Sequence, residues 1–95
     1  MQSVRRAIEH LNPQEAYVVS DRCVELLLQD GRRVRVTAQQ EMKSGSRYWA
    51  DHEIAYAMEH NGEDVTVWGS TDLPWADGDS VEDCLAHAIL LMAGP

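Results

Sequence analysis

The first apolar residues of the chain recur at helical spacing. Val4, Ile8 and Leu11 fall on one face of a helix, so we expect a helix over residues 3–11. Ser3 is predicted to cap its start, and the Asn-Pro step that follows is predicted to end it.

A β-hairpin is predicted around Asp30-Gly31, because alternating apolar residues flank this turn sequence. A two-residue turn would place leucines and arginines on the same face. A three-residue loop with the glycine in the left-handed bulge position instead pairs Leu26 with Val34, which makes one face apolar. On the other face Glu25 then meets Arg35, a favourable cross-strand pair. The apolar pattern therefore selects the longer loop.

Residues 48–60 fit two structures. Their aromatic and alanine residues are compatible with a helix, whereas Ile54, Tyr56 and Met58 alternate as in a strand. The Asn61-Gly62 step favours the strand, because Asn-Gly between alternating runs is a strong hairpin signal.

The same turn determines which residues meet at the tip of this second hairpin. It places Glu59 opposite Asp64 and His60 opposite Glu63. Like charges that face each other across a hairpin destabilise it. These carboxylates are therefore expected to serve something other than the fold.

A helix is predicted at the C-terminal end, after a cap sequence that can be used in two frames. Asp79 can act with Glu82, or Ser80 with Asp83. The apolar residues that follow cover more than one helical stripe, and we expect them to pack on a sheet. A homodimer interface through residues 89–92 is the alternative. The predicted apolar face is formed by Val81, Cys84, Leu85, Ala88 and Met92, and is widened by Ile89, Leu90 and Leu91.

In chain order, the predicted elements are a helix, a strand over residues 16–20, the first hairpin, a loop over residues 39–47, the second hairpin and a helix. This order predicts an α+β fold: an antiparallel β-sheet of about five strands (two hairpins) with N- and C-terminal helices packed on one face. The chain is predicted to form a single domain, 1–95, because its length suits one domain.

Composition predicts a cytoplasmic protein. No apolar run is long enough to span a membrane. No apolar segment follows Arg5 and Arg6, so no secretory signal is expected. Two cysteines, Cys23 and Cys84, are too few to indicate a disulfide framework.

Charge divides the chain into two halves. All eight Lys and Arg residues lie within residues 1–47, while residues 48–95 hold ten acids and no Lys or Arg. This separation favours a basic partner for the C-terminal half. The alternative is that the acids only keep the protein soluble.

Motifs for catalysis or metal binding are incomplete. His52-Glu53 begins like a zinc-protease motif, but Tyr56 stands where the second histidine is needed. His52 and His60 are expected at the surface, too far apart to share one metal ion. The Asp77-Gly78-Asp79 stretch lacks the ligand spacing of a calcium loop, and Cys84 falls on an apolar helix face. Neither an enzyme activity nor a metal or cofactor is therefore predicted.

Direct nucleic-acid binding is not expected either. Arg32, Arg33 and Arg35 could form a small basic patch, but the sequence isoelectric point is about 4.7 and the other half would repel phosphate. We interpret these arginines as protection of an edge strand against aggregation.

Residues 70–79 join the last strand to the last helix and place Trp75 among acids. Tryptophan is a frequent interface anchor, and loops often carry function. Packing of Trp75 back over the core is the alternative.

The string Asp72-Leu73-Pro74, followed by residues 78–88, resembles the end of a HicB-type antitoxin domain. That family has a strand, an Asp-Leu-Pro-Gly-Cys loop, then Gly-Asp-Thr and an amphipathic helix, and the hairpin over residues 54–69 fits this order. Trp75 stands where the family has glycine, the loop cysteine is absent and the connecting loop is shorter. The resemblance implies a sheet-plus-helix scaffold and a partner-neutralising role.

These patterns together predict a non-enzymatic acidic binding protein. We expect an inhibitor that docks its acidic half on the basic, nucleic-acid-binding surface of a target protein, as anti-CRISPR-type phage proteins or antitoxins do. The alternatives are a self-associating assembly subunit that uses the C-terminal helix, and a small hydrolase or metal-dependent enzyme. No membrane partner is expected. The residues predicted to bind the partner are Glu59, Glu63, Asp64, Asp72, Trp75, Asp77, Asp79 and Glu82.

Overall fold

A computed structural model describes residues 2–41 and 47–94, which form two helices and an antiparallel sheet. The α+β class with terminal helices is therefore confirmed. Part of the predicted loop over residues 39–47 lies outside the described residues. The elements are α1 (Gln2–Leu11), β1 (Glu15–Ser20), β2 (Cys23–Leu27), β3 (Arg33–Gln40), β4 (Tyr48–His60), β5 (Glu63–Ser70), β6 (Ala76–Gly78) and α2 (Val81–Met92).

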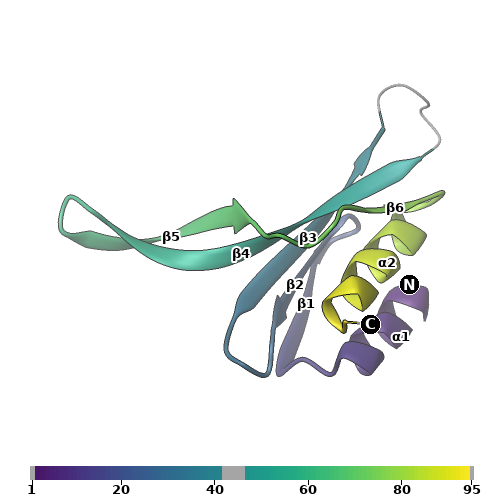
Figure 1. The fold of residues 1–95 in the computed structure, drawn as a ribbon, viewed down its shortest axis with the longest axis horizontal. Coiled ribbons are helices and arrows are strands. Elements are labelled where there is room, and N and C mark those ends of the chain that lie inside the picture. The colour runs from purple at the N-terminus through teal and green to yellow at the C-terminus, as the bar shows by residue number, and fades with distance from the viewer. Residues whose placement is uncertain (1, 42–46, 95) are drawn as a thin grey trace.

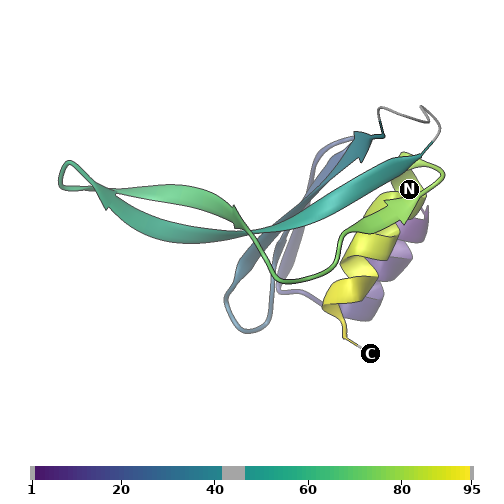
Figure 2. The same ribbon diagram turned by 45° about the horizontal axis from the view of Figure 1, so that its top comes forward.

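The sheet is a meander in which the strands lie side by side in the order β1-β2-β3-β4-β5. The short strand β6 pairs with the first residues of β4, on the edge that β5 occupies further along. Both helices cover one face of the sheet (Figures 1 and 2). We call this the inner face and the opposite, helix-free face the outer face. Strand β6 was not predicted, because its three residues lie within the expected loop.

The hairpin registers predicted from the apolar pattern are confirmed. Leu26 pairs with Val34 between β2 and β3, and Gly31 in their loop has φ 90°. Residues 48–60 are strand rather than helix, and β4 pairs with β5 across the predicted two-residue turn. Its residues Asn61 and Gly62 have φ 53° and 82°, the left-handed values that this hairpin turn requires.

The core lies between the inner face and the two helices. Val24 and Leu26 of β2 and Val36 of β3 belong to the same core cluster as Leu85 and Ile89 of α2, and all five are fully buried. Alanines at several of the remaining core positions let the helices approach the sheet closely. These are Ala7, Ala38, Ala50, Ala76, Ala86 and Ala88.

The two helices are joined at their N-terminal ends. Helix α1 begins at Gln2, so the prediction that Ser3 caps it is wrong. The Ser3 amide instead donates a hydrogen bond to a carboxylate oxygen of Glu82, at 2.7 Å. The carboxylate of α2 thus satisfies an amide that the first turn of α1 leaves without a helical partner. Helix α2 is capped by Ser80, whose hydroxyl accepts from the Asp83 amide.

Beyond Ile54 the sheet narrows to two strands. The last residue pair between β3 and β4 is Val34 with Ile54, whereas β4 and β5 remain paired as far as His60 and Glu63. Residues 55–68 therefore form a two-stranded projection, which we call the arm. Figure 1 shows it extending away from both helices. The arm makes the molecule elongated, with principal extents of 45 × 31 × 25 Å.

Close contact between β6 and α2 gives a test of this packing. A Cβ atom at Gly78 would lie 2.6 Å from the backbone nitrogen of Cys84. We expect Gly78→Ala to lower the free energy of unfolding by roughly 1–3 kcal/mol, because backbone must shift to admit the methyl group. Urea denaturation measures this loss.

Gly69→Ala is the matched control. The three atoms nearest to its Cβ would all belong to the Tyr56 side chain, the closest at 3.0 Å, and this side chain can rotate away. Equal losses for the two variants would contradict the close packing of β6 on α2.

Candidate partner-binding surface

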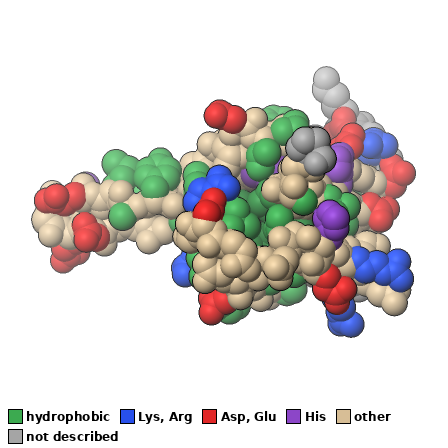
Figure 3. Space-filling view, turned by 60° about the horizontal axis from the view of Figure 1, so that its bottom comes forward, with side chains coloured by type: hydrophobic (Ala, Val, Ile, Leu, Met, Phe, Trp, Pro, Cys, Tyr) green, Lys and Arg blue, Asp and Glu red, His purple; other side chains and the backbone are tan. Residues whose placement is uncertain are grey.

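The tip of the arm carries three carboxylates. Glu59 of β4 faces Asp64 of β5, and His60 faces Glu63, as predicted. All four residues are exposed. None of the three acids forms an ion pair with another described residue. Figure 3 shows these carboxylates as a red group at the end of the projection.

The two faces of the arm differ in chemistry. On the side that continues the inner face, Tyr56 and Met58 pair with Val67 and Val65. The exposed fractions are 47% for Tyr56, 49% for Met58 and 40% for Val65, because the helices end before this part of the sheet. Apolar side chains appear in green along the arm in Figure 3.

The outer face of the arm carries small side chains. At the base of the arm, an arginine of β3 contacts a tryptophan on this face. Ala55 pairs with Trp68 there. The guanidinium of Arg35 lies 4.3 Å from the centre of the Trp68 ring and 3.2 Å from a Glu53 carboxylate oxygen. A cation over an indole face is favourable, so this contact fixes the base of the arm to β3.

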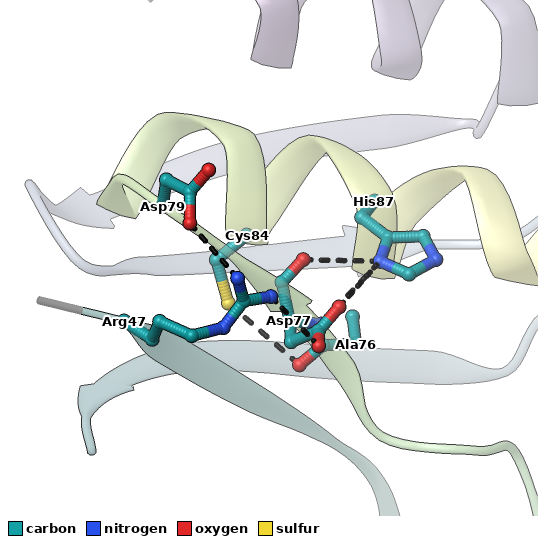
Figure 4. Close-up of polar contacts among 6 residues, drawn as sticks. All are labelled: Arg47, Ala76, Asp77, Asp79, Cys84 and His87. Carbon is teal, nitrogen blue, oxygen red and sulfur yellow. Dashed lines mark hydrogen bonds and ion pairs between the residues drawn. The ribbon is translucent and has the colours of Figure 1, made fainter. Parts of the chain in front are cut away.

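Three of the other predicted acids have partners within the protein. Arg47 lies 2.9 Å from a carboxylate oxygen of Asp77 and 2.9 Å from one of Asp79 (Figure 4). Glu82 accepts from the Ser3 amide. Asp72 is exposed and forms no ion pair with a described residue. The predicted acids therefore do not form one surface.

Trp75 lies at the surface on a second aromatic. Its ring stacks on Trp49, with the centroids 4.8 Å apart and the planes inclined by 20°. Trp75 remains 66% exposed, so it does not cover the core. Trp49 of β4 points to the outer face, and Trp68 of β5 pairs with Ala55, which points to the same face. Because Trp75 stacks on Trp49, all three tryptophans lie on the outer face.

Cys84 is poorly placed for nucleophilic chemistry. Burial, and secondarily the negative charge of Asp77, raises the pKa of its thiol to about 11. The sulfur lies 3.9 Å from the carbonyl oxygen of Ala76 (Figure 4). At neutral pH the thiol is therefore protonated, whereas a nucleophilic cysteine acts as thiolate.

His52 was expected at the surface, and that expectation is wrong. It points from β4 under α2, where it is fully buried, and its Nε2 lies 2.6 Å from the Ala88 carbonyl oxygen. Nδ1 is buried without a hydrogen-bond partner among the described residues. Of these two histidines, only His60 is exposed. Within residues 2–41 and 47–94, no group of three or more His, Cys, Asp or Glu side chains is arranged to hold a metal ion.

A groove of about 500 Å³ lies where the arm leaves the body. Its lining includes the apolar side chains of Leu28, Ile54 and Leu73 together with the charged Arg32 and Asp72. The charge pattern of the sequence could suggest the arm tip, but not this groove, because its residues come from four separate segments.

The residues of α2 expected to mediate self-association differ in exposure. Ile89 is fully buried, Leu91 and Met92 are partly buried against the core, and Leu90 is 43% exposed. Neither of the two described helices is long and apolar enough to cross a membrane.

No protein-family model, curated protein or solved structure matches this chain. The interpretation of the surface therefore depends on its own geometry and charge.

The environment of the two cysteines predicts a difference in reactivity. Under native conditions at mildly alkaline pH, we expect iodoacetamide to modify half-buried Cys23 faster than Cys84, because the thiolate is the reactive form and Cys84 is both buried and protonated. Peptide mass spectrometry over time measures both rates. In denaturant the two rates should converge, and a native Cys84 that reacts as fast as Cys23 would overturn the assignment.

Proposed function

We propose that the chain is a non-enzymatic binding protein that inhibits a nucleic-acid-binding partner by docking acidic residues on the partner's basic surface. The observation that carries this proposal is the tip of the arm. Glu59, Glu63 and Asp64 are exposed there and lack ion pairs with described residues.

The carboxylates at the tip destabilise the hairpin, which supports a role for them other than folding. Opposed carboxylates repel each other, and a two-stranded projection has little packing to offset this repulsion. Three acids between residues 77 and 82 differ, because Asp77, Asp79 and Glu82 each have an internal partner. The part of the molecule that projects furthest thus carries three neighbouring carboxylates without an ion pair to a described residue.

A basic, nucleic-acid-binding surface fits this arrangement. Such a surface carries Lys and Arg side chains placed for phosphates, and carboxylates on a narrow arm offer negative charge and hydrogen-bond acceptors to the same side chains. The net charge of −8 adds long-range attraction to a basic target. Inhibition then follows from competition with the nucleic acid for one site.

Changing the tip acids tests the proposal. The immobilised protein is used to capture partners from lysate, and a captured nucleic-acid-binding protein is purified for calorimetry. We expect Glu63→Gln with Asp64→Asn to weaken binding about tenfold at low salt, because two charges at the contact are removed. We also expect the chain to displace a labelled oligonucleotide from the partner.

The matched control is Asp77→Asn with Asp79→Asn, which removes the same charge from acids that Arg47 already contacts. This variant should bind nearly as the unchanged chain does. An equal loss for both variants would show that only net charge matters. Binding that is independent of salt and of the tip acids would refute the proposal.

A further inference from the structure

Strand β1 lies at the end of the sheet opposite to β5, and no described strand occupies its outer edge. All six of its residues are exposed. They include three consecutive large apolar residues, Tyr17 at 52%, Val18 at 59% and Val19 at 57%. Exposed edge strands are commonly protected by lysine, proline or an inward charge. Residues 16–19 are Ala-Tyr-Val-Val and contain none of these.

The free edge of β1 presents the backbone groups of two residues. The Ala38 amide donates to the Arg22 carbonyl, so along β2 the even-numbered residues direct their backbone groups towards β3 and the odd-numbered residues towards β1. Tyr17 pairs with an odd-numbered residue of β2. The N–H and C=O groups of Ala16 and Val18 therefore point away from the sheet. The register of β1 shifts only after Val18, so this stretch is a regular template for another strand.

Helix α1 leaves the inner side of β1 uncovered. Val18 lies on the inner face, because it pairs with a core residue of β2. With Val4 and Ile8 of α1 it borders a mostly apolar hollow of about 200 Å³. Two charged residues of α1, Arg5 and Glu9, line the same hollow. Both are exposed, and neither forms an ion pair with a described residue.

A second copy of β1 in antiparallel orientation is complementary to this edge. With a two-fold axis at Tyr17, Ala16 of each chain pairs with Val18 of the partner subunit, so the outward backbone groups of both residues are hydrogen-bonded. The side chain of Tyr17 then packs on its own copy across the outer face. On the inner face, Val18 is covered by the neighbouring strand.

The charges on α1 suit the same arrangement. A two-fold axis reverses the direction of the second α1, so the two helices lie antiparallel on one face of the joined sheet. Arg5 of each chain then comes to the side on which Glu9 of the partner subunit lies. Opposite charges at such a contact favour this orientation. A two-fold contact is self-complementary and closed, so assembly ends at the dimer.

We propose that a second copy of this chain pairs with the free edge of β1, forming a two-fold dimer with a continuous sheet in the order β2-β1-β1-β2. The apolar residues Tyr17 and Val18 form the centre of the contact. Because β1 and β5 lie at opposite ends of the sheet, both arms remain free, and the dimer is independent of the proposed inhibitory function. It also differs from a dimer through α2.

Oligomeric state in solution tests this proposal. By sedimentation equilibrium we expect the unchanged chain to have twice the monomer mass of 10.7 kDa. Ala16→Pro removes an outward N–H of β1 and should give the monomer mass, because proline cannot donate to a new ladder.

Thr66→Pro is the matched control for this variant. The Thr71 amide donates to the His52 carbonyl of β4, so the even-numbered residues of β5 direct their backbone groups outward. Thr66→Pro thus removes an outward N–H from the opposite edge of the sheet and should remain dimeric. Circular dichroism verifies that both variants are folded. A monomeric unchanged chain, a dimer that survives Ala16→Pro, or loss of the dimer on Thr66→Pro overturns the proposal.

Disulfide cross-linking tests the register in a folded dimer without a proline. Tyr17 and its copy would form a non-hydrogen-bonded pair, whose Cα atoms lie about 4.5 Å apart, within the range that a disulfide spans. In a chain that carries Cys23→Ser, mild oxidation of Tyr17→Cys should therefore yield a covalent dimer on a non-reducing gel. Cys84 is buried and should not contribute.

Glu15→Cys is the control for register. Glu15 lies on the same face of β1 as Tyr17, but its two copies would be more than about 13 Å apart along the strands, at about 3.4 Å per residue. It should cross-link much more slowly. Equal cross-linking of the two variants, or none with Tyr17→Cys, overturns the proposed pairing. None of these outcomes depends on whether the tip acids bind a target.

Discussion

The sheet is longer than the helices that cover it, and most properties of the molecule follow from this mismatch. Helices of 10 and 12 residues span about 15–18 Å, whereas the 13 residues of β4 span about 44 Å. The covered half of β4 is packed and includes the fully buried His52. The other half is exposed on both faces. One strand therefore contributes to the core and to the surface.

The mismatch also divides the acids by role. Near the helices, carboxylates are used inside the molecule: Glu82 accepts from Ser3, and Arg47 lies between Asp77 and Asp79. The two ion pairs of Arg47 are exposed and contribute little to stability. On the arm no Lys or Arg accompanies the acids. The strongly negative C-terminal half is thus partly neutralised by two arginines from the N-terminal half, Arg35 and Arg47, neither of which reaches the acids at the tip of the arm.

The strands and their registers could be predicted because their signals are local. Alternation of Leu26 with its neighbours, together with the bulge glycine, fixes the first hairpin, and Asn61-Gly62 fixes the second. The features that the sequence could not predict depend on residues far apart. Burial of His52 requires α2 to lie over β4, and the exposure of Tyr56 on the same face requires the helices to end before the arm. The alternation in β4 is the same in its covered and exposed halves, so no local signal separates them. The acids at the tip could be predicted to face one another because the Asn-Gly turn fixes the register of their hairpin. The contacts of Asp77 and Asp79 with Arg47, and of Glu82 with Ser3, could not be predicted, because they join distant parts of the sequence.

The hydrogen bond between Ser3 and Glu82 has a consequence for synthesis of the chain. It joins residues 79 positions apart, while every neighbouring strand pair from β1 to β5 is a short-range hairpin or meander contact. As the chain leaves the ribosome, the meander can pair strand by strand, but α1 must wait for residues 81–92 before its partner helix exists. During that interval the inner face stands bare, with Val24, Leu26 and Val36 exposed to water. A message truncated before α2 would therefore yield a paired but uncovered sheet, a species prone to aggregate and suited to recognition by chaperones and proteases.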